Sequence, residues 1–248
     1  NPGNGYTHGN VAISGGGGAN ATADLIVTSD DITGVQSFSG RVWVAQGRTV
    51  YYTSAASVSD FTSISSGNVL LADATLHGNI VQLLSANNFL YIFGDDSINV
   101  FSDVRVTSNG ATLFTNTNVS ASVGTKLPYA IFPYFRSVLF MNNYGVYALV
   151  GSTTSKVSDA LDGMFTNIDF LTEETTGGQV LMNNILCAAF NFRYTGSNGV
   201  SAGPRYMQAV FFDKKWFFTN QGNSVKYVVS APVGGETYLF GTTGSKLY

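Results

Sequence analysis

Short segments of alternating hydrophobic and polar residues recur along this chain, and Gly, Asn and Asp separate them. In residues 40–54, GRVWVAQGRTVYYTS, β-branched and aromatic residues dominate, and Gln46-Gly47 supplies a turn. A period of two with a central turn predicts a β-hairpin. The alternation assigns the side chains to two faces, with Val42, Val44, Val50 and Tyr52 on one and Trp43 and Tyr51 on the other.

Similar hairpins are predicted at four later positions. They span residues 89–101, 138–150, 207–218 and 237–248, with turns at 94–96, 142–143, 213–215 and 241–244. A further apolar strand is expected before three of them, at 80–84, 129–132 and 227–229. Successive hairpins with an added strand are typical of an antiparallel meander.

The hairpins are regularly spaced. Val42 and Phe89 are 47 residues apart, and Phe89 and Val138 are 49 residues apart. A further step of about 48 residues leads near Leu186, where a strand is expected over 183–192. This spacing fits the length of a propeller blade, so we predict an all-β fold, a β-propeller-like array of about five four-stranded meander blades. The unit is repeated because the two faces of one blade are buried only when neighbouring blades pack against them. A β-sandwich built from similar meanders is the alternative.

Two segments depart from the strand pattern. Residues 1–34 are rich in Gly and Asn and include GGGG at 15–18, so we expect an N-terminal arm with one strand at 24–28, followed by a propeller domain over 35–248. Within residues 155–174, apolar side chains recur at helical spacing after Ser158, a suitable N-cap, which predicts a short helix or two helical turns. The chain lacks an initiator Met and ends where a strand begins, so we expect an incomplete propeller from a longer protein.

Charge is sparse in this chain. Charged residues make up 11% of the 248 residues, whereas roughly 25% is usual for a soluble domain. The net charge is −3 and the largest basic cluster is Lys214-Lys215, so one monomer does not present the several phosphate contacts that tight nucleic-acid binding needs. A surface of Asn, Ser, Thr and Gly is common in exported and virion proteins. No apolar run approaches the roughly 20 residues of a membrane-spanning helix.

Few residues are candidates for chemistry. His8 and His77 have no second ligand at a metal-binding spacing, and Cys187 lies among apolar residues that favour a buried thiol. Asp95-Asp96 lies at a predicted turn, where Asp caps its own backbone, although a calcium pair or a glycosidase carboxylate is the functional alternative.

Other acidic residues have structural explanations. Asp159 and Asp162 are expected to stabilise a helix N-terminus, and Glu173-Glu174 to form a solvated loop pair. We therefore assign no catalytic, cofactor-binding or metal-binding residue, and we predict that the protein is not an enzyme.

Three segments, taken in order, resemble one protein family. They are GRVWVAQGRTVYYTSAASVSDF, NNFLYIFGDDSINVFSD and SVLFMNNYGVYALVGSTTSKVSDALDGMF. The chain is similar here to the packaged-DNA stabilisation proteins, also called head-completion or tail-hub proteins, of short-tailed bacteriophages, and to related tail nozzle proteins. The resemblance covers residues 35–170, and the chain is only blade-like from Thr175 onward.

The resemblance implies a structural role in the virion, at the portal–tail junction or in the tail nozzle. In that family the propeller forms part of a ring around the DNA channel and helps to retain the packaged genome. It therefore implies a homo-oligomeric ring that contacts the portal and other tail proteins, lets genomic DNA pass without binding it tightly, and has no membrane contact.

Two other function classes stay open. One is a carbohydrate-binding propeller or a phage host-contact protein, in which exposed aromatic residues such as Trp43, Trp216 and Tyr144 serve as sugar platforms. The other is a glycoside hydrolase, which requires a pair of carboxylates in a cleft.

Overall fold

The computed structural model describes residues 9–12, 22–25, 32–72, 76, 78–196, 205–220, 225–233 and 236–242. In this part of the chain, three four-stranded antiparallel sheets follow one another in sequence. The first contains β3 (Ile32–Phe38), β4 (Arg41–Gln46), β5 (Thr49–Tyr52) and β6 (Gly67–Leu70). The second contains β7 (Ile80–Ala86), β8 (Phe89–Gly94), β9 (Ile98–Val106) and β10 (Thr112–Ser120). The third contains β11 (Ile131–Tyr134), β12 (Ser137–Asn142), β13 (Gly145–Val150) and β14 (Thr153–Lys156).

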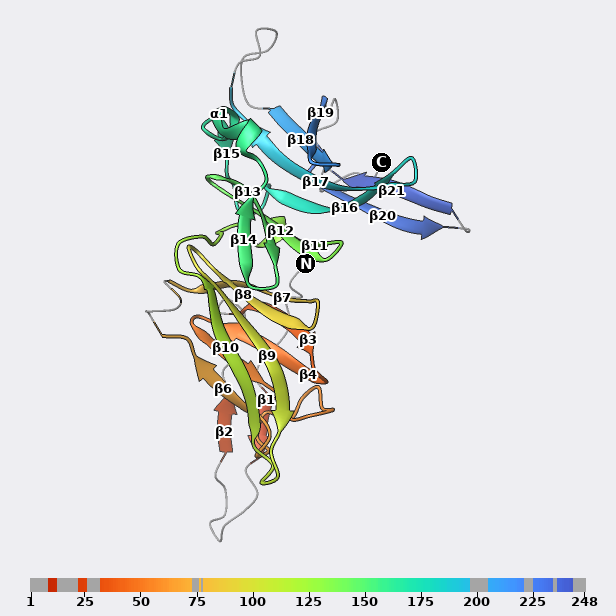
Figure 1. The fold of residues 1–248 in the computed structure, drawn as a ribbon. Coiled ribbons are helices and arrows are strands. Elements are labelled where there is room, and N and C mark those ends of the chain that lie inside the picture. Colours follow the sequence, from red (N-terminus) through yellow and green to blue (C-terminus); the bar gives the residue numbers. More distant parts are fainter. Residues whose placement is uncertain are drawn as a thin grey trace.

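A fourth sheet has five strands. Its meander contains β16 (Thr176–Met182), β17 (Ile185–Tyr194), β18 (Arg205–Phe212) and β19 (Lys215–Asn220), and the short β15 (Ile168–Asp169) also pairs with β17. Two hairpins complete the described strands: β1 (Gly9–Ala12) with β2 (Thr22–Leu25), and β20 (Tyr227–Val233) with β21 (Glu236–Thr242). In Figure 1, the sheets succeed one another along an elongated molecule, from orange through green to blue.

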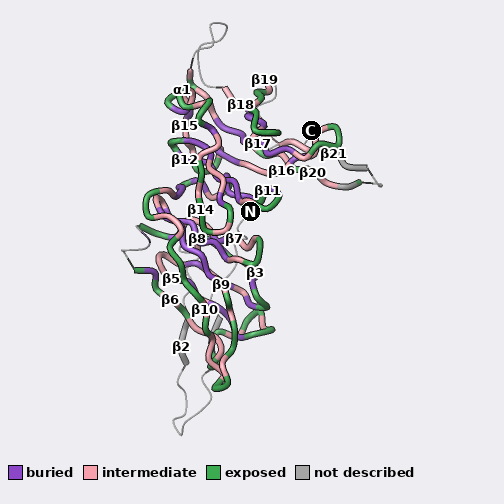
Figure 2. Tube along the Cα trace, in the orientation of Figure 1, coloured by how far each residue is buried: buried purple, intermediate pink, exposed green. Residues whose placement is uncertain are grey.

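The sheets are stacked face to face, as the blades of a propeller are. Along β8, Leu90 and Ile92 enter the core shared with the first sheet, whereas Tyr91 and Phe93 enter the core shared with the third sheet. Because successive side chains of a strand point to opposite faces, the second sheet is covered on both sides. Figure 2 shows the resulting bands of buried chain through the middle of the sheets.

The third sheet repeats this arrangement. Val138 and Phe140 of β12 face the second sheet, and Leu139 and Met141 face the fourth. A two-sheet sandwich has one core between its sheets, whereas here consecutive cores separate consecutive sheets. The predicted all-β, propeller-like array of four-stranded meanders is therefore confirmed.

The predicted faces of the first hairpin are wrong. Trp43 pairs with Tyr52, and Ala45 pairs with Val50, so these four side chains share the buried face, while Val44 lies opposite Tyr51 on the outer face. The turn is formed by Gly47-Arg48 and not by Gln46-Gly47, because Gln46 pairs directly with Thr49. Any two-residue turn here places odd-numbered residues of β4 on the same face as even-numbered residues of β5, so Val42 and Val44 cannot share a face with Val50 and Tyr52.

The last predicted hairpin is also wrong in its described part. Residues 236–242 form a single strand, β21, whose partner is β20. Gly241 pairs with Val228 inside that ladder and does not open a turn. The predicted strand at 227–229 is part of β20, and residues 243–248 lie outside the described chain.

The helical prediction for residues 155–174 is confirmed in a short form. A 3-10 turn, η2 (Asp159–Leu161), leads into α1 (Asp162–Phe165), which connects the third and fourth sheets. Ser158 precedes η2, but its side chain does not cap this helix. The Ser158 hydroxyl instead accepts a hydrogen bond of 2.8 Å from the backbone N–H of Val146.

The link between the second and third sheets is held from both sides. The buried Thr125 donates its backbone N–H to the carbonyl of Gly94 in β8, at 2.9 Å. Its hydroxyl donates to the carbonyl of Met141 in β12, at 2.5 Å. One residue therefore joins two adjacent sheets, and the linker that carries it cannot shift without breaking both contacts.

Candidate functional site

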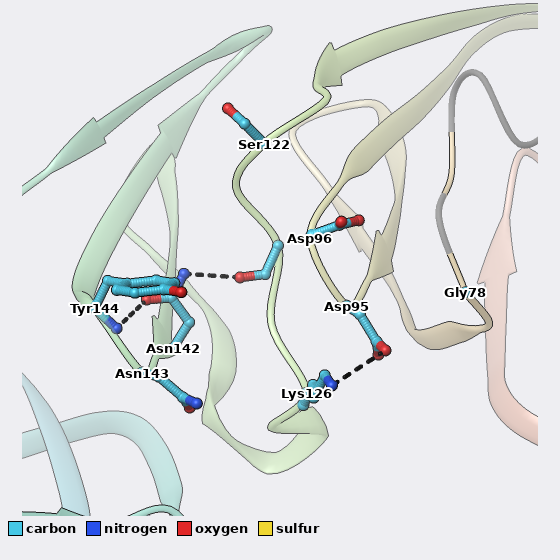
Figure 3. A pocket seen from close by; sticks show the side chains of 9 residues that line it. Gly78, Asp95, Asp96, Ser122, Lys126, Asn142, Asn143 and Tyr144 are labelled. Atoms are coloured by element: carbon cyan, nitrogen blue, oxygen red, sulfur yellow. Dashed lines mark hydrogen bonds and ion pairs between the residues drawn. The ribbon is translucent and has the colours of Figure 1, made fainter.

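The second and third sheets form a pocket of about 330 Å³ where their turns lie side by side. This volume lies near the lower end of the range of small-molecule sites, roughly 300–1,000 Å³. Figure 3 shows the β8–β9 turn on one side, the β12–β13 turn on the other, and the linker after β10 between them. The lining residues are Gly78, Asp95, Asp96, Ser122, Gly124, Lys126, Asn142, Asn143 and Tyr144.

The linker at the base of the pocket packs directly on the β8–β9 turn. A Cβ placed on Gly124 would lie 2.3 Å from the carbonyl oxygen of Gly94 and 2.4 Å from the backbone nitrogen of Ser97. Both neighbours are backbone atoms, so they cannot rotate away as the end of a flexible side chain would. Glycine at this position therefore allows the close approach that forms the base.

Asn142 fixes the opposite wall. Its side-chain amide donates to the carbonyl of Gly124 at 2.9 Å, and its side-chain oxygen accepts hydrogen bonds from the N–H groups of Tyr144 and Gly145 at 2.9 and 3.1 Å. The backbone of the β12–β13 turn is thus tied to the linker. The Tyr144 side chain itself remains 75% exposed, so a fixed backbone presents a free aromatic ring at the rim.

Charged groups of both signs line the opening. The Lys126 ammonium lies 3.6 Å from Oδ2 of Asp95, and both side chains reach solvent. Asp96 lies beside Asp95 on the same turn, as predicted for an acidic pair at a hairpin turn. The pocket therefore combines carboxylate acceptors, an ammonium donor, the amide of Asn143 and one aromatic ring.

The three aromatic residues considered as sugar platforms have different environments. Trp43 is fully buried and donates its indole N–H to the carbonyl of Phe38 at 2.9 Å, so the expectation of an exposed ring is wrong. Trp216 is half-buried, and its indole N–H donates to the carbonyl of Val157 at 3.0 Å. Tyr144 alone of these three residues is exposed beside a pocket. The alternation pattern that suggested Trp43 could not distinguish the covered face from the open one.

The remaining acidic candidates are placed away from this pocket. Asp159 and Asp162 each begin a helical turn, as expected, and both form ion pairs with Lys156. Glu174 is not a solvated loop residue. It forms an ion pair of 2.6 Å with Lys226 and accepts a hydrogen bond of 2.8 Å from the Tyr206 hydroxyl. The hydrogen bond from Lys226 is the largest cause that lowers the pKa of Glu174.

Cys187 is a buried free thiol, as predicted from its neighbours. It is 5% exposed and packs with Val180, Ala189 and Val210. Burial raises the pKa of the Cys187 thiol, which disfavours the reactive thiolate. His8 and His77 lie outside the described residues.

Apolar side chains are exposed on the outer face of the first sheet and on the part of the fourth sheet that the β20–β21 hairpin leaves uncovered. On the first sheet, Val35 pairs with Val44, and Val44 pairs with Tyr51, so one apolar stripe crosses three strands. Val35 is 58% exposed. The fourth sheet carries an apolar hollow of about 240 Å³, lined by Met182, Asn183, Ile185, Cys187, Val210, Phe212, Phe217 and Thr219. We call these two surfaces the first end face and the last end face.

Among the described residues, no group of three or more His, Cys, Asp or Glu side chains is placed to hold a metal ion. In the same part of the chain, no helix is long and apolar enough to cross a membrane.

Comparisons with known proteins find similarity in structure alone. No known protein family matches the sequence, and no curated protein is significantly similar to it. The crystal structure of the N-terminal domain of Nup159 is 13% identical with a TM-score of 0.46, and the match covers 88% of this chain and 59% of that chain. A structure of S. cerevisiae Dbp5 bound to Nup159, Gle1, IP6 and ADP is 12% identical with the same TM-score and coverage. This chain thus spans 59% of the length of the chains it matches.

The sequence pattern missed the pocket as a unit. It drew attention to Asp95-Asp96, to the turn at 142–143 and to Tyr144 separately, but not to Ser122, Gly124 or Lys126. A signal was present in the regular spacing. Equivalent turns of consecutive blades lie at the same end of the stack, so the turns at 94–96 and 142–143 could have been paired.

Proposed function

We propose that this protein is a structural, non-enzymatic component of a bacteriophage virion, at the portal–tail junction or in the tail nozzle, where copies of it form a ring around the DNA channel. The observation that carries the proposal is the contrast between the covered interior sheets and the apolar side chains that stay exposed on the two end faces, the last of which the β20–β21 hairpin covers in part. The three segments that resemble the phage family fold as the central hairpins of three consecutive sheets, together with their adjoining turns.

The end faces favour contacts between copies. The first end face carries Val35, Val44 and Tyr51, and the last end face carries Ile185 and Phe217. Apolar stripes of this kind on sheets that elsewhere stack face to face are typical of interaction surfaces. Because the two faces differ, a contact between them is head-to-tail, and head-to-tail contacts that close give rings.

The charge balance agrees with a channel through which DNA passes. The chain carries 12 Lys and Arg residues against 15 Asp and Glu residues. A wall with few cations holds phosphates weakly, since each phosphate contact adds to affinity and to its salt dependence. In this proposal each copy binds DNA weakly, and the genome is retained by the complete ring together with the adjoining portal and tail proteins.

The first experiment measures assembly. We expect mass photometry and electron microscopy of the purified protein to reveal rings. We expect Val35→Asp on the first end face and Phe217→Asp on the last end face to reduce assembly, because each buries a charge in the contact. Val58→Asp is the matched control, since Val58 is 79% exposed on a loop outside both end faces.

Two results would overturn the proposal. One is a protein that remains monomeric at high concentration and is missing from the tails of the phage whose genome encodes it. The other is tight binding of duplex DNA by the assembled protein, with a salt dependence that corresponds to several phosphate contacts. A hydrolase screen on glycans and esters tests the non-enzymatic part, because activity lost in Asp95→Asn would assign catalysis to the pocket.

A further inference from the structure

We propose that the pocket between the second and third sheets binds a neutral carbohydrate. This inference goes beyond the proposed structural role and depends on other residues than the end faces do. It starts from the juxtaposition of the exposed Tyr144 ring with the carboxylates of Asp95 and Asp96, the ammonium of Lys126 and the amide of Asn143 around one cavity.

The lining groups match the chemistry of a sugar. A pyranose presents hydroxyl groups around its edge and C–H groups on its faces. Carboxylates accept hydrogen bonds from hydroxyl groups, and an ammonium or amide donates to hydroxyl oxygens. A tyrosine ring offers an apolar face and a polar tip, so it can cover the C–H face of the sugar while its edge stays in water.

The same groups disfavour other small ligands. Two adjacent carboxylates repel phosphate and other anions at the opening. The Lys126 ammonium, 3.6 Å from Oδ2 of Asp95, opposes a second cation at that carboxylate. Within the described part of the chain, no group of acidic, His and Cys side chains is arranged for a metal ion. A neutral ligand rich in hydroxyl groups avoids both kinds of repulsion.

The pocket is organised before any ligand arrives. Asn142 ties Tyr144 to the linker, and Thr125 ties the linker to both sheets. Gly124 packs against the backbone of the β8–β9 turn, which carries Asp95 and Asp96. Binding therefore requires little ordering of the backbone, and the affinity lost to ordering is small.

The arrangement suits the end of a glycan. Tyr144 and Asn143 stand on one side of the opening and Asp96 on the other (Figure 3), so one sugar ring can contact both turns. The remaining residues of a chain would extend into solvent. Terminal hexoses and N-acetylhexosamines are the neutral sugars that we would test first, against sialic acid and uronic acids as anionic counterparts.

The experiment is a titration followed by NMR with the isotope-labelled protein. Glucose, galactose, mannose and the two corresponding N-acetylhexosamines are added separately, each up to its solubility limit, and sialic acid and glucuronic acid serve as anionic probes. We expect at least one neutral sugar to cause saturable shifts of the amides of Asp96 and Tyr144, and the anionic sugars to cause none.

Variants distinguish this pocket from a general surface effect. We expect Tyr144→Ala to weaken the binding by about tenfold, the size expected when an aromatic anchor is removed. Tyr144→Phe keeps the ring and should retain most of the affinity. Tyr129→Ala is the matched control, because Tyr129 is 50% exposed but does not line the pocket. Since Tyr144 is exposed, we expect its replacement to leave the unfolding temperature unchanged.

Three results would overturn the inference. They are no saturable shift with any neutral sugar, preferential binding of the anionic sugars, and equal loss of affinity in Tyr144→Ala and Tyr129→Ala. None of them bears on ring formation, which is measured separately with the end-face variants.

Discussion

Strands β12 and β4 occupy equivalent places in their sheets but differ in how many faces are covered. In β12, every residue from Val138 to Asn142 is buried. In β4, buried and half-buried residues alternate, and Val44 lies on the outer side. The outer side is nevertheless apolar in sequence. An apolar strand face in the sequence therefore indicates that another sheet can pack against it. Only the tertiary structure shows whether a sheet of the same chain does so.

The contrast has an energetic consequence for stability. A side chain between two sheets loses its contact with water and gains packing on all sides, whereas a side chain on an end face keeps much of its exposure in one copy of the chain. Apolar burial contributes roughly 25 cal/mol per Å², so interior positions contribute most to folding. End-face positions contribute less to the folding of one copy, because much of their apolar area stays in water.

The largest expected effect is at the interior core. Phe140 is fully buried, with its ring 5.3 Å from that of Phe93 and 5.5 Å from that of Tyr147. We expect Phe140→Ala to lower the free energy of unfolding by about 3–5 kcal/mol. Val44→Ala on the first end face should cost less than about 1 kcal/mol in the monomer, because the side chain is only half-buried. Urea unfolding followed by tryptophan fluorescence measures both.

A milder variant keeps this comparison useful if Phe140→Ala does not fold. Phe140→Leu removes the ring contacts but keeps most of the apolar volume, so we expect a cost between those of the other two variants. Equal changes in stability for Phe140→Leu and Val44→Ala would show that the end face contributes to the monomer as much as the interior does.

A smaller effect is expected at the junction of two interior sheets. Gly124→Ala places a methyl group against the backbone of Gly94 and Ser97, so we expect a loss of about 1–3 kcal/mol. Gly163→Ala is the control in α1, where an added Cβ meets no atom within 4 Å. That change should stabilise the protein by up to about 1 kcal/mol, because alanine favours a helix. Thermal unfolding compares the two, and a neutral Gly124→Ala would contradict the close packing described here.

The smallest effect concerns the attachment of the β20–β21 hairpin to the fourth sheet. Glu174 and Lys226 form an ion pair across this junction, and the pair is partly exposed. We expect Glu174→Gln to cost up to about 1 kcal/mol near neutral pH. Glu173→Gln is the matched control, because Glu173 contacts the hairpin through its backbone carbonyl, which accepts from the Tyr227 hydroxyl at 3.0 Å.

The cost of Glu174→Gln should depend on pH. The pKa of Glu174 is lowered in the folded protein, so its contribution is present above its unfolded pKa, about 4.3, and is lost as the pH falls through the folded pKa. The pKa of Lys226 is raised, chiefly by its hydrogen bond with Glu174, so its contribution is present below its unfolded pKa, about 10.4, and is lost as the pH rises through the folded pKa. Unfolding temperatures of the two proteins should therefore converge in acid, and a constant difference across the pH range would contradict the ion pair.

Much of the fold could be predicted from the sequence, and the residues explain why. Apolar runs bounded by turn residues, such as those in residues 89–101, specify strands, and the spacing of 47 and 49 residues between Val42, Phe89 and Val138 specifies repeated meanders. Faces were less predictable, because Trp43 and Val44 are both apolar and only packing against the second sheet decides which one points inward.

The candidate site was predictable only in fragments. Asp95-Asp96 and Tyr144 belong to turns that are 48 residues apart, measured from Asp96 to Tyr144. Each turn has a local explanation in its own hairpin, so neither indicates a partner. The pocket arises where two blades lie next to each other, and the buried Thr125 and Asn142 that hold it together resemble ordinary polar residues in sequence.

The sequence by itself determined the strand content, the order of the meanders and the scarcity of charge, because these depend on local alternation, turn residues and composition. The tertiary structure decided which apolar faces are buried, that Glu174 forms an ion pair with Lys226, and that Tyr144 lines a polar cavity. The physical reason is that strand formation depends on residues near one another in the chain, whereas burial and convergence depend on which sheets stack together.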